Sequence, residues 1–520
     1  MSERPPRLLD RLLLLRPGGS AAIWIALVIG LTARAAWLRA PAWNPPSLFF
    51  DDQWVGIVAT RMTVSDYLAL RPPVPAGFAL LLASLARLFA DPEWPLQLLP
   101  TACSVALVPL TGWTLHRLTG RPALGLLAAA MVVVDPRLAT FGVRVKPYAL
   151  DALLAVGLVL LATWVARAPD RSRHGVLAAA AVMAALLSFP ALFVGGALVG
   201  AFLLLGLRAG RDRARASLLA TLVFTAGGGL VYVLLLRGAA RLPLSVYWRS
   251  YLLPTGDAGE AARFLLTRGV GFLTGPFPRS LEWLCLLVPV GLSILLWRRA
   301  TRWLGVAILL LGIEVVAASA LGGYPIGGAR TDMYAHGILI ILVCCALLPL
   351  FSARVSRWSG AVLAVAALAL VLSSAKPSRY PPRRDAELVR RAHATLGPDD
   401  TLLLFPAAGI AAGYYWPGEV LLLPAARPCG FTTVVRHALS ETLDRGRGRG
   451  PSATLARLRR LLRAEPPRIV YLATNISGRA HQRIRDTILA AGYEVDGRQR
   501  GPVAALTIFR RVGPDPASSP

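Results

Sequence analysis

The chain has 520 residues, of which 55% are hydrophobic, and its mean hydropathy is +0.56. Such a composition excludes an ordinary soluble globular protein and indicates a multi-spanning membrane protein. The formal charge of +28 does not indicate a nucleic-acid partner, because the sequence has no nucleic-acid-binding motif and arginines in short loops orient membrane spans.

Eleven apolar segments are candidate transmembrane helices, since about 20 residues cross the hydrocarbon core. The N-terminal tail is basic and the first apolar run lacks a small-residue cleavage site, so we expect an uncleaved first span. The candidate spans are 20–38, 95–115, 122–140, 147–166, 175–189, 190–207, 217–236, 281–297, 303–321, 336–351 and 358–374.

Clusters of arginine set the expected orientation, because basic residues are retained in short cytoplasmic loops. They fall at every second connection if "SFPALF" (188–193) is a tight outer turn, which places the N-terminus inside and the C-terminus outside. The clusters are Arg4/Arg7/Arg11/Arg16, Arg117/Arg121, Arg167/Arg171/Arg173, Arg208/Arg211/Arg213/Arg215, Arg298/Arg299/Arg302 and Arg354/Arg357.

Two further apolar segments do not fit this count. Segment 74–90 is short and contains Arg87, and a span there would reverse every later loop, so we expect a helix in the outer interface. An ordinary span is the alternative. In the outward loop 237–280, "EAARFLLTRGVGFL" predicts a second interfacial helix.

The first outward loop, 39–94, carries the adjacent acids Asp51 and Asp52 among aromatic residues. Aromatics anchor a segment at the lipid boundary, where partial desolvation raises a carboxylate's pKa and makes it a better base. Adjacent side chains point in different directions, so we expect one acid, Asp51 by slight preference, to face a substrate. The alternative is that both acids serve only solubility.

In the same loop, "LRPPVP" (70–75) places Arg71 on a stiff backbone before two prolines. A rigidly held cation at the outer surface suits a lipid-linked phosphate. The alternative is a basic residue at a helix entrance.

The second outward loop, "GVRVKPYALDALLAV" (142–156), gathers Arg144, Lys146, Tyr148 and Asp151 where a span begins. An ionisable residue within a span is a functional candidate because its burial is costly. Lys146 is one of two lysines in the chain and suits a phosphate contact. The alternative is that Lys146 and Asp151 pair with each other.

The third outward loop, "LGGYPIGGARTDMYAHG" (321–337), places Arg330 and Asp332 among glycines that allow close backbone approach. His336 begins the next span, where a lone histidine is more often structural than catalytic.

After residue 375 the pattern changes to a soluble α/β domain, 376–520, behind a Pro/Arg-rich linker. Alternating strands and amphipathic helices indicate a mostly parallel sheet. The expected strands are 401–405, 419–423, 468–474 and 503–509, and the expected helices are 452–464 and 478–493. "GRGRG" (446–450) reads as a flexible loop.

The first 375 residues resemble the GT-C glycosyltransferases that use polyprenyl-phosphate sugars, such as the protein O-mannosyltransferase superfamily and the lipid A aminoarabinose transferase. The resemblance rests on the order of five motifs: the acidic pair, "RPP" (71–73), "VKPYALD" (145–151), "SFPALFV" (188–194) and "YPIGGAR" (324–330). The pair is Asp-Asp rather than the commoner Asp-Glu, and the proline motif begins with Arg rather than His or Lys.

The resemblance implies a polytopic enzyme of the bacterial inner membrane that moves a sugar from a polyprenyl phosphate to a hydroxyl acceptor on the outer face. Asp51 or Asp52 would be the catalytic base, giving inversion. Cations, with Arg71, Lys146 and Arg330 foremost, would hold the departing phosphate. No cofactor is expected, although a divalent metal is compatible with paired aspartates. A lipid-linked-sugar flippase and a surface-polysaccharide polymerase or ligase are the alternatives.

Overall fold

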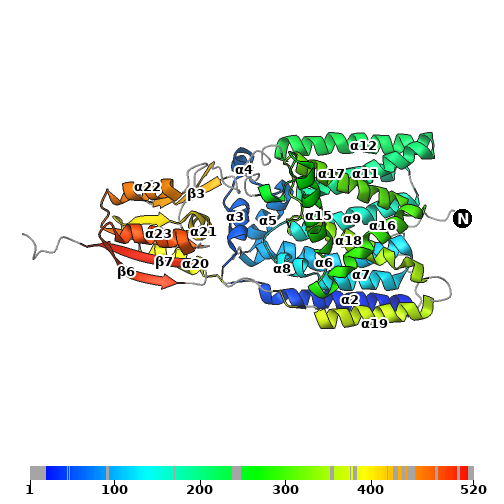
Figure 1. The fold of residues 1–520 in the computed structure, drawn as a ribbon, viewed down its shortest axis with the longest axis horizontal. Coiled ribbons are helices and arrows are strands. Elements are labelled where there is room, and N and C mark those ends of the chain that lie inside the picture. The colour runs from blue at the N-terminus through cyan, green and yellow to red at the C-terminus, as the bar shows by residue number, and fades with distance from the viewer. Residues whose placement is uncertain are drawn as a thin grey trace, which may run out of the picture.

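The computed structural model describes residues 19–512 apart from 44, 46, 90–92, 169, 237–247, 329, 352–355, 375, 379–382, 418–419, 425–430, 436–439, 443–450, 475–477 and 501–503. A bundle of helices is joined at one end to a smaller α/β part (Figure 1). The basic N-terminal tail, Arg354 and the "GRGRG" loop lie outside the described residues.

The helical part runs from α2 to α19. Its α-helices are α2 (Gly19–Arg39), α3 (Phe50–Thr60), α4 (Val64–Leu70), α5 (Ala76–Leu88), α6 (Glu93–Thr119), α7 (Pro122–Val134), α8 (Pro136–Phe141), α9 (Tyr148–Arg167), α10 (Arg171–Leu187), α11 (Pro190–Ala209), α12 (Arg211–Val231), α15 (Ala258–Thr274), α16 (Leu287–Trp297), α17 (Arg302–Ala320), α18 (His336–Ala346) and α19 (Ser356–Ser374). Short helical turns are η1 (Ala40–Ala42), η2 (Tyr232–Leu236), η3 (Arg249–Tyr251), η4 (Arg279–Leu286), η5 (Met333–Ala335) and η6 (Leu348–Phe351).

Eight helical stretches among the described residues are long and apolar enough to cross a membrane. They are 22–42, 93–119, 148–167, 190–209, 211–235, 279–297, 302–320 and 333–350. These match eight of the eleven predicted spans. The chain is therefore a multi-pass membrane protein, as its composition predicts, while the count of eleven stays a prediction.

The predicted span 122–140 is wrong in one respect, because the helix breaks at Asp135. Pro136 follows, and a proline has no N–H to continue the helical hydrogen bonds. Asp135 instead caps α8, with Oδ1 accepting hydrogen bonds from the backbone N–H groups of Arg137 (2.8 Å) and Leu138 (2.9 Å). Its Oδ2 lies 2.6 Å from Nδ1 of His336, and both side chains are fully buried. His336 is thus held in a buried polar pair, which agrees with its expected structural role.

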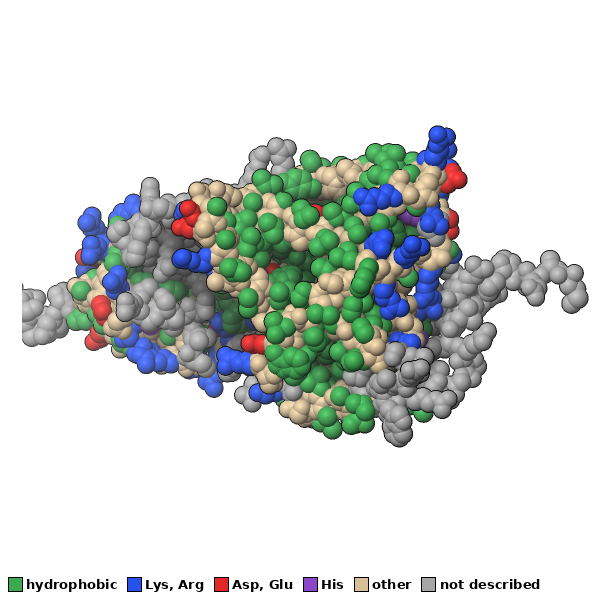
Figure 2. Space-filling view, turned by 45° about the vertical axis from the view of Figure 1, so that its right-hand side comes forward, with side chains coloured by type: hydrophobic (Ala, Val, Ile, Leu, Met, Phe, Trp, Pro, Cys, Tyr) green, Lys and Arg blue, Asp and Glu red, His purple; other side chains and the backbone are tan. Residues whose placement is uncertain are grey.

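Arginines gather at the end of the helical part that lies away from the α/β part (Figure 2). The described helix connections that carry the predicted clusters are those between α6 and α7, α9 and α10, α11 and α12, and α16 and α17. Between this end and the α/β part, the surface shown in Figure 2 is mostly hydrophobic. This arrangement fits a lipid-facing belt with one basic rim.

Both predicted interfacial segments are helical, as α5 and α15. Helix α5 has 13 residues, which is too short to span a bilayer unaided. Its first turn packs closely on the end of α10, where a Cβ at Gly77 would lie 2.9 Å from the carbonyl oxygen of Leu186. The position of α5 and α15 in the membrane interface stays a prediction.

The α/β part begins with α20 (Asp385–Thr395) and contains α21 (Pro406–Tyr415), α22 (Pro451–Leu462) and α23 (Gly478–Leu489). Its strands are β1 (Thr401–Leu404), β2 (Val420–Pro424), β3 (Phe431–Val435), β4 (Ser440–Thr442), β5 (Arg468–Thr474), β6 (Tyr493–Arg500) and β7 (Ala504–Arg511). The main sheet has the order β4-β1-β5-β7-β6, and β2 and β3 form a separate antiparallel pair.

The expectation of a mostly parallel sheet is wrong. β1 pairs in parallel with β4 and β5, but β7 is antiparallel to both β5 and β6. Strand β6 was not among the predicted strands, because its sequence "YEVDGRQR" is largely polar. It lies at the edge of the sheet, where a strand needs no apolar run. The predicted strand at 419–423 is present as β2 but belongs to the smaller sheet.

Two hydrophobic cores lie in the described residues. One fills the helix bundle. The other is shared, since it joins residues of α3 and α5, such as Ile57 and Phe78, to residues of α20, α21 and β1, such as Leu388, Ala408 and Leu402. The α/β part is therefore packed onto the end of the bundle through apolar contact, because burial of such surface stabilises association.

We predict that Asp135→Ala lowers the melting temperature of the detergent-purified protein strongly. The loss of a helix cap costs roughly 0.5–2 kcal/mol, and the substitution also removes the only described hydrogen-bond partner of the buried His336 ring. Asp170→Ala is the control, because Asp170 caps α10 through the N–H of Arg173 but has a half-exposed side chain. Equal losses of stability in both variants would contradict the buried pair's contribution.

Candidate functional site

The acidic pair lies in the first turn of α3, which begins directly after Phe49. Carboxylates are favoured there by the partial positive charge of a helix N-terminus. Asp52 is fully buried, whereas the side chain of Asp51 is 21% exposed. The two acids therefore occupy different environments, as expected for neighbours on one helix.

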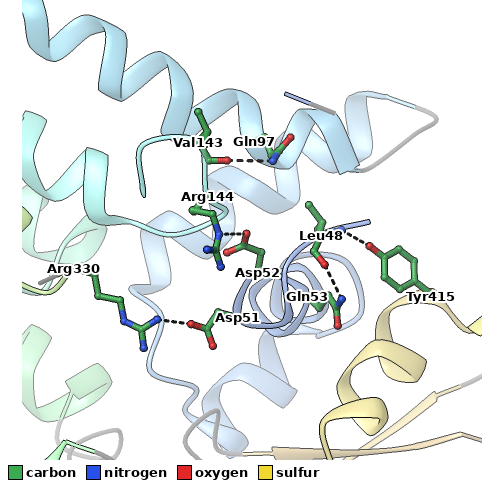
Figure 3. Close-up of polar contacts among 9 residues, drawn as sticks. All are labelled: Leu48, Asp51, Asp52, Gln53, Gln97, Val143, Arg144, Arg330 and Tyr415. Carbon is green, nitrogen blue, oxygen red and sulfur yellow. Dashed lines mark hydrogen bonds and ion pairs between the residues drawn. The ribbon is translucent and has the colours of Figure 1, made fainter. Parts of the chain in front are cut away.

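Each acid pairs with a cation from a different later loop (Figure 3). Asp52 Oδ2 accepts a hydrogen bond from Nε of Arg144 at 2.6 Å. Asp51 Oδ2 pairs with Nη1 of Arg330. Residues 51–52, 144 and 330, which are far apart in the sequence, thus meet at the bundle end nearest the α/β part (Figures 1 and 3).

The loop that carries Arg144 is bonded to α6 and contains a tight turn. Gln97 of α6 is fully buried and donates from Nε2 to the carbonyl oxygen of Val143 at 3.2 Å. The N–H of Lys146 donates to the carbonyl oxygen of Arg144 at 2.7 Å, which makes a tight turn. These contacts hold the backbone of the loop that carries Arg144 and Lys146 beside α6.

Lys146 lies against the aromatic residues of α3. Its Nζ is 3.8 Å from the ring centroid of Trp54, and the residue is only 6% exposed. Burial lowers the pKa of Lys146 to about 8, although Asp51 and Asp52 oppose this shift. The guanidinium of Arg144 lies 3.9 Å from the Phe49 ring centroid. Phe49 and Trp54, beside the acids, therefore contact cations, while their place at a lipid boundary stays a prediction.

The pKa of Asp51 differs from the sequence-based expectation. Burial alone would raise it, but the charges of Lys146, Arg330 and Arg144 together outweigh burial and bring the pKa below its ordinary value. The prediction of a raised pKa is wrong for Asp51, because the sequence did not show how many cations surround it. Asp51 is ionised at neutral pH.

Tyr148 and Asp151 lie in the first turns of α9, beneath these charges. The Tyr148 hydroxyl is near enough to Arg330 and Asp51 for their charges to act on it. Asp151 is 6% exposed, and its carboxyl group lies within hydrogen-bonding reach of the Ser188 side chain. The charged neighbours that act on Lys146 are Asp51 and Asp52 together with two arginines, so the alternative of a Lys146–Asp151 pair finds no support.

Two predicted residues lie differently from the rest. Asp332 is almost fully buried just before η5, close to Tyr324 and Tyr334. Arg71 ends α4 with a left-handed backbone (φ 45°), is exposed, and donates from Nε to the carbonyl oxygen of Leu68 at 3.3 Å. No described contact joins Arg71 to the acidic pair.

Several residues near the site escaped the sequence analysis. Trp248 lies beside Arg330, with its ring centroid 5.2 Å from the guanidinium carbon. Arg383 lies 4.5 Å from the centroid of Phe49, the ring that Arg144 also contacts. Arg383 falls in the linker and Trp248 in a loop without a motif, so neither gave a local signal.

An apolar cavity of about 810 Å³ lies between α2, α6, α9 and α10. Its lining includes Trp24, Trp113, Leu154 and Leu187. Leu187 also contacts the first turn of α5, and Leu154 follows Asp151 by one turn of α9. The cavity therefore lies within the membrane-spanning part and reaches the helix turns nearest the charged residues.

Among the described residues, no group of three or more His, Cys, Asp or Glu side chains is arranged to hold a metal ion. The five charged groups that act on one another around the acidic pair are Asp51, Asp52, Arg144, Lys146 and Arg330, and their charges sum to +1 when all are ionised. Such an arrangement can bind an anion and present a carboxylate to it at the same time.

The sequence matches no protein-family model, and a search of curated proteins finds no match. Solved structures do resemble the fold. ArnT from Cupriavidus metallidurans in the apo state has a TM-score of 0.53 at 12% identity, covering 94% of this chain and 98% of that one. The same protein bound to undecaprenyl phosphate has a TM-score of 0.50 at 11% identity over the same shares of both chains.

The oligosaccharyltransferase of Archaeoglobus fulgidus, in complex with Zn and sulfate, has a TM-score of 0.50 at 12% identity. The match covers 75% of this chain but only 61% of that longer protein. ArnT is a lipid A aminoarabinose transferase, and both neighbours are GT-C fold enzymes. The chain therefore has a GT-C fold with a small C-terminal sheet domain, as its motifs predict.

Proposed function

We propose that this protein is a membrane glycosyltransferase that moves a sugar from a polyprenyl phosphate to a hydroxyl acceptor. The observation that carries the proposal is the cluster of Asp51, Asp52, Arg144, Lys146 and Arg330, brought together from three loops. The fold supports it, since structural neighbours with this fold include an ArnT structure bound to undecaprenyl phosphate.

The donor presents an anionic phosphate and an apolar chain. Arg330 and Lys146 can hold the phosphate, because fixed cations stabilise the charge that develops as the sugar leaves. Arg330 is 20% exposed, which leaves it accessible to a ligand. The apolar cavity lined by Trp113 and Leu187 is suited to the lipid chain, which α5 would guide toward it.

The acceptor hydroxyl needs a base on the opposite side of the sugar from the phosphate. Each acid pairs with an arginine, but Asp51 is the better candidate, because it is ionised and partly exposed, whereas Asp52 is fully buried. As the sugar–phosphate bond breaks, the hydroxyl oxygen attacks the anomeric carbon and its proton passes to the carboxylate. A single direct displacement inverts that carbon. We infer that Tyr148, Asp151 and Asp332 contact the sugar or the acceptor.

The proposed reaction also bears on the need for a cofactor, and the arginines on the orientation in the membrane. The three cations neutralise the phosphate charge, so the proposal requires no cofactor, and chelation of metal ions should leave transfer intact. The arginine-rich end would face the cytoplasm of a bacterial inner membrane, with the charged cluster outside. Residues 1–375 would form the catalytic domain, and residues 376–520 an extracytoplasmic domain.

The acidic pair provides the first test. We predict that Asp51→Asn lowers the turnover of the purified protein by at least about 100-fold, because general base catalysis typically contributes 10²–10⁴-fold. Asp52→Asn should also reduce transfer, because it weakens the anchor of Arg144. Turnover is measured as lipid phosphate released from a polyprenyl-phosphate sugar.

Asp66→Asn is the matched control, since Asp66 lies in the same outward loop but is only half-buried and hydrogen-bonds only to Thr63 in the contacts described. Normal turnover in Asp51→Asn, Asp52→Asn and the double variant would refute the proposed base. Asp66→Asn should transfer sugar like the wild-type protein.

Lys146 provides a pH-dependent test. Its pKa is about 8, so the side chain is charged below that pH and loses its charge as the pH rises through it. A sugar linked through a phosphodiester keeps its charge over this range. We therefore predict that the KM for the donor rises above about pH 8 in the wild-type protein.

Lys146→Arg is the comparison, because arginine stays charged at any pH of the assay. In that variant the KM should stay level through pH 8 to 9. A wild-type KM that is constant from pH 7 to 9, in a protein that remains folded, would exclude Lys146 from the phosphate site. Arg71→Ala should raise the KM less than Lys146→Met does, because Arg71 is exposed and apart from the cluster.

A further inference from the structure

We propose that the α/β domain positions the acid-bearing helix α3, and that Gln53, Asp385 and Tyr415 are the positioning residues that do so. This inference rests on the proposed function, because positioning matters only if α3 carries the reacting carboxylate. It assigns a role in the reaction to residues that do not touch the substrate.

The start of α3 is hydrogen-bonded to the α/β domain at three points. Gln53 Nε2 donates to Asp385 Oδ2 at 2.8 Å and to the carbonyl oxygen of Leu48 at 2.8 Å. The N–H of Leu48 donates to the hydroxyl of Tyr415 at 2.6 Å, as Figure 3 shows. The N–H of Ala386 donates to Oγ of Ser47 at 3.0 Å.

These bonds lie in a buried interface, where each is costly to break. Ser47, Leu48, Gln53 and Asp385 are fully buried, and Tyr415 is 9% exposed. Removing one partner of a buried hydrogen bond leaves the other unsatisfied, which costs more than a hydrogen bond at the surface. The segment that leads into the acidic pair is therefore fixed by the α/β domain as well as by the membrane part.

The rest of α3 is held by α21. A Cβ added to Gly56 would lie 2.6 Å from a ring carbon of Tyr414, so the helix and this ring approach as closely as a glycine allows. At the end of α3, Nη2 of Arg61 donates to the carbonyl oxygen of Trp416 at 3.0 Å. The domain thus contacts the helix near its start, middle and end.

A second connection runs through an aromatic ring. Arg383 pairs with Asp385 at 3.2 Å, and its guanidinium lies over Phe49. Arg144, the partner of Asp52, lies over the same ring. A movement of the domain's first residues would therefore disturb the cation that holds one of the two acids.

The geometry of a helix explains why these contacts bear on the reaction. Gln53 follows Asp52 directly, and consecutive side chains differ in direction by about 100° on a helix with 3.6 residues per turn. Fixing Gln53 against Asp385 therefore fixes the rotation of α3, and with it the directions of Asp51 and Asp52. Misplacement of a reacting group by about 1 Å can cost about 100-fold in rate.

The test uses Gln53→Met and Asp385→Leu in the full-length protein. We predict that both lower kcat per folded molecule by roughly 10- to 100-fold, since α3 is no longer held in register. The KM for the donor should change little, because the proposed phosphate ligands Lys146 and Arg330 lie on other loops. Asp385→Asn, which keeps an oxygen to accept from Gln53, should retain more turnover than Asp385→Leu.

Asp400→Asn is the matched control. Asp400 is a mostly buried acid of the same domain that pairs with Arg468 at 3.1 Å, away from α3. It should lower the melting temperature without changing kcat per folded molecule. If Gln53→Met and Asp385→Leu behave in the same way as this control, the positioning role is overturned.

Hydrogen exchange of the α3 peptides separates this proposal from the proposed function. The backbone amide hydrogens of residues 50–60 should exchange faster in Gln53→Met than in the wild-type protein or in Asp400→Asn. Equal protection of these amides in all three proteins would overturn the proposal. This measurement needs no substrate. If the wild-type protein transfers no sugar while exchange in Gln53→Met increases, the proposed function fails and the structural coupling stands.

Discussion

The pairing of two adjacent carboxylates with cations from distant loops is the constraint on which the rest of the site depends. Arg144 and Arg330 are 186 residues apart in the sequence, yet each contacts one acid of α3. A buried charge without a partner strongly destabilises the folded state. The buried acids and cations are therefore tolerated only when the loops that carry Arg144 and Arg330 meet α3. Lys146 adds a third cation, which leaves the cluster with a positive charge that an anion can neutralise.

The α/β part extends this constraint beyond the membrane. Its first helix and α21 share a hydrophobic core with α3 and α5, so the acid-bearing helix is packed between two parts of the chain. The charged loops approach α3 on one side, and Gln53 and Gly56 meet the domain on another. A helix held in this way has little freedom to rotate, which is the preorganisation that charge stabilisation in an active site requires.

The sequence predicted the parts of the fold that have strong local signals. Long apolar runs located eight of the spanning helices, and motif order indicated the GT-C fold. The break at Asp135 has a local signal in Pro136, which the apolar run 122–140 outweighed, and the polar strand β6 has no apolar run to reveal it. The lowered pKa of Asp51, by contrast, depends on cations distant in the chain. For the same reason Gln53 and Asp385 carried no signal, since each is an ordinary polar residue until folding places them 2.8 Å apart.

We propose that this charged cluster receives a lipid-linked sugar phosphate and releases the lipid phosphate. The direct measurement incubates the purified wild-type protein with a panel of polyprenyl-phosphate sugars and acceptor hydroxyls, and follows free polyprenyl phosphate by mass spectrometry. We expect at least one donor to release polyprenyl phosphate, in an amount equal to the acceptor that becomes glycosylated. Binding of donors, or their movement across vesicle membranes, without any release would contradict the proposal and favour a flippase.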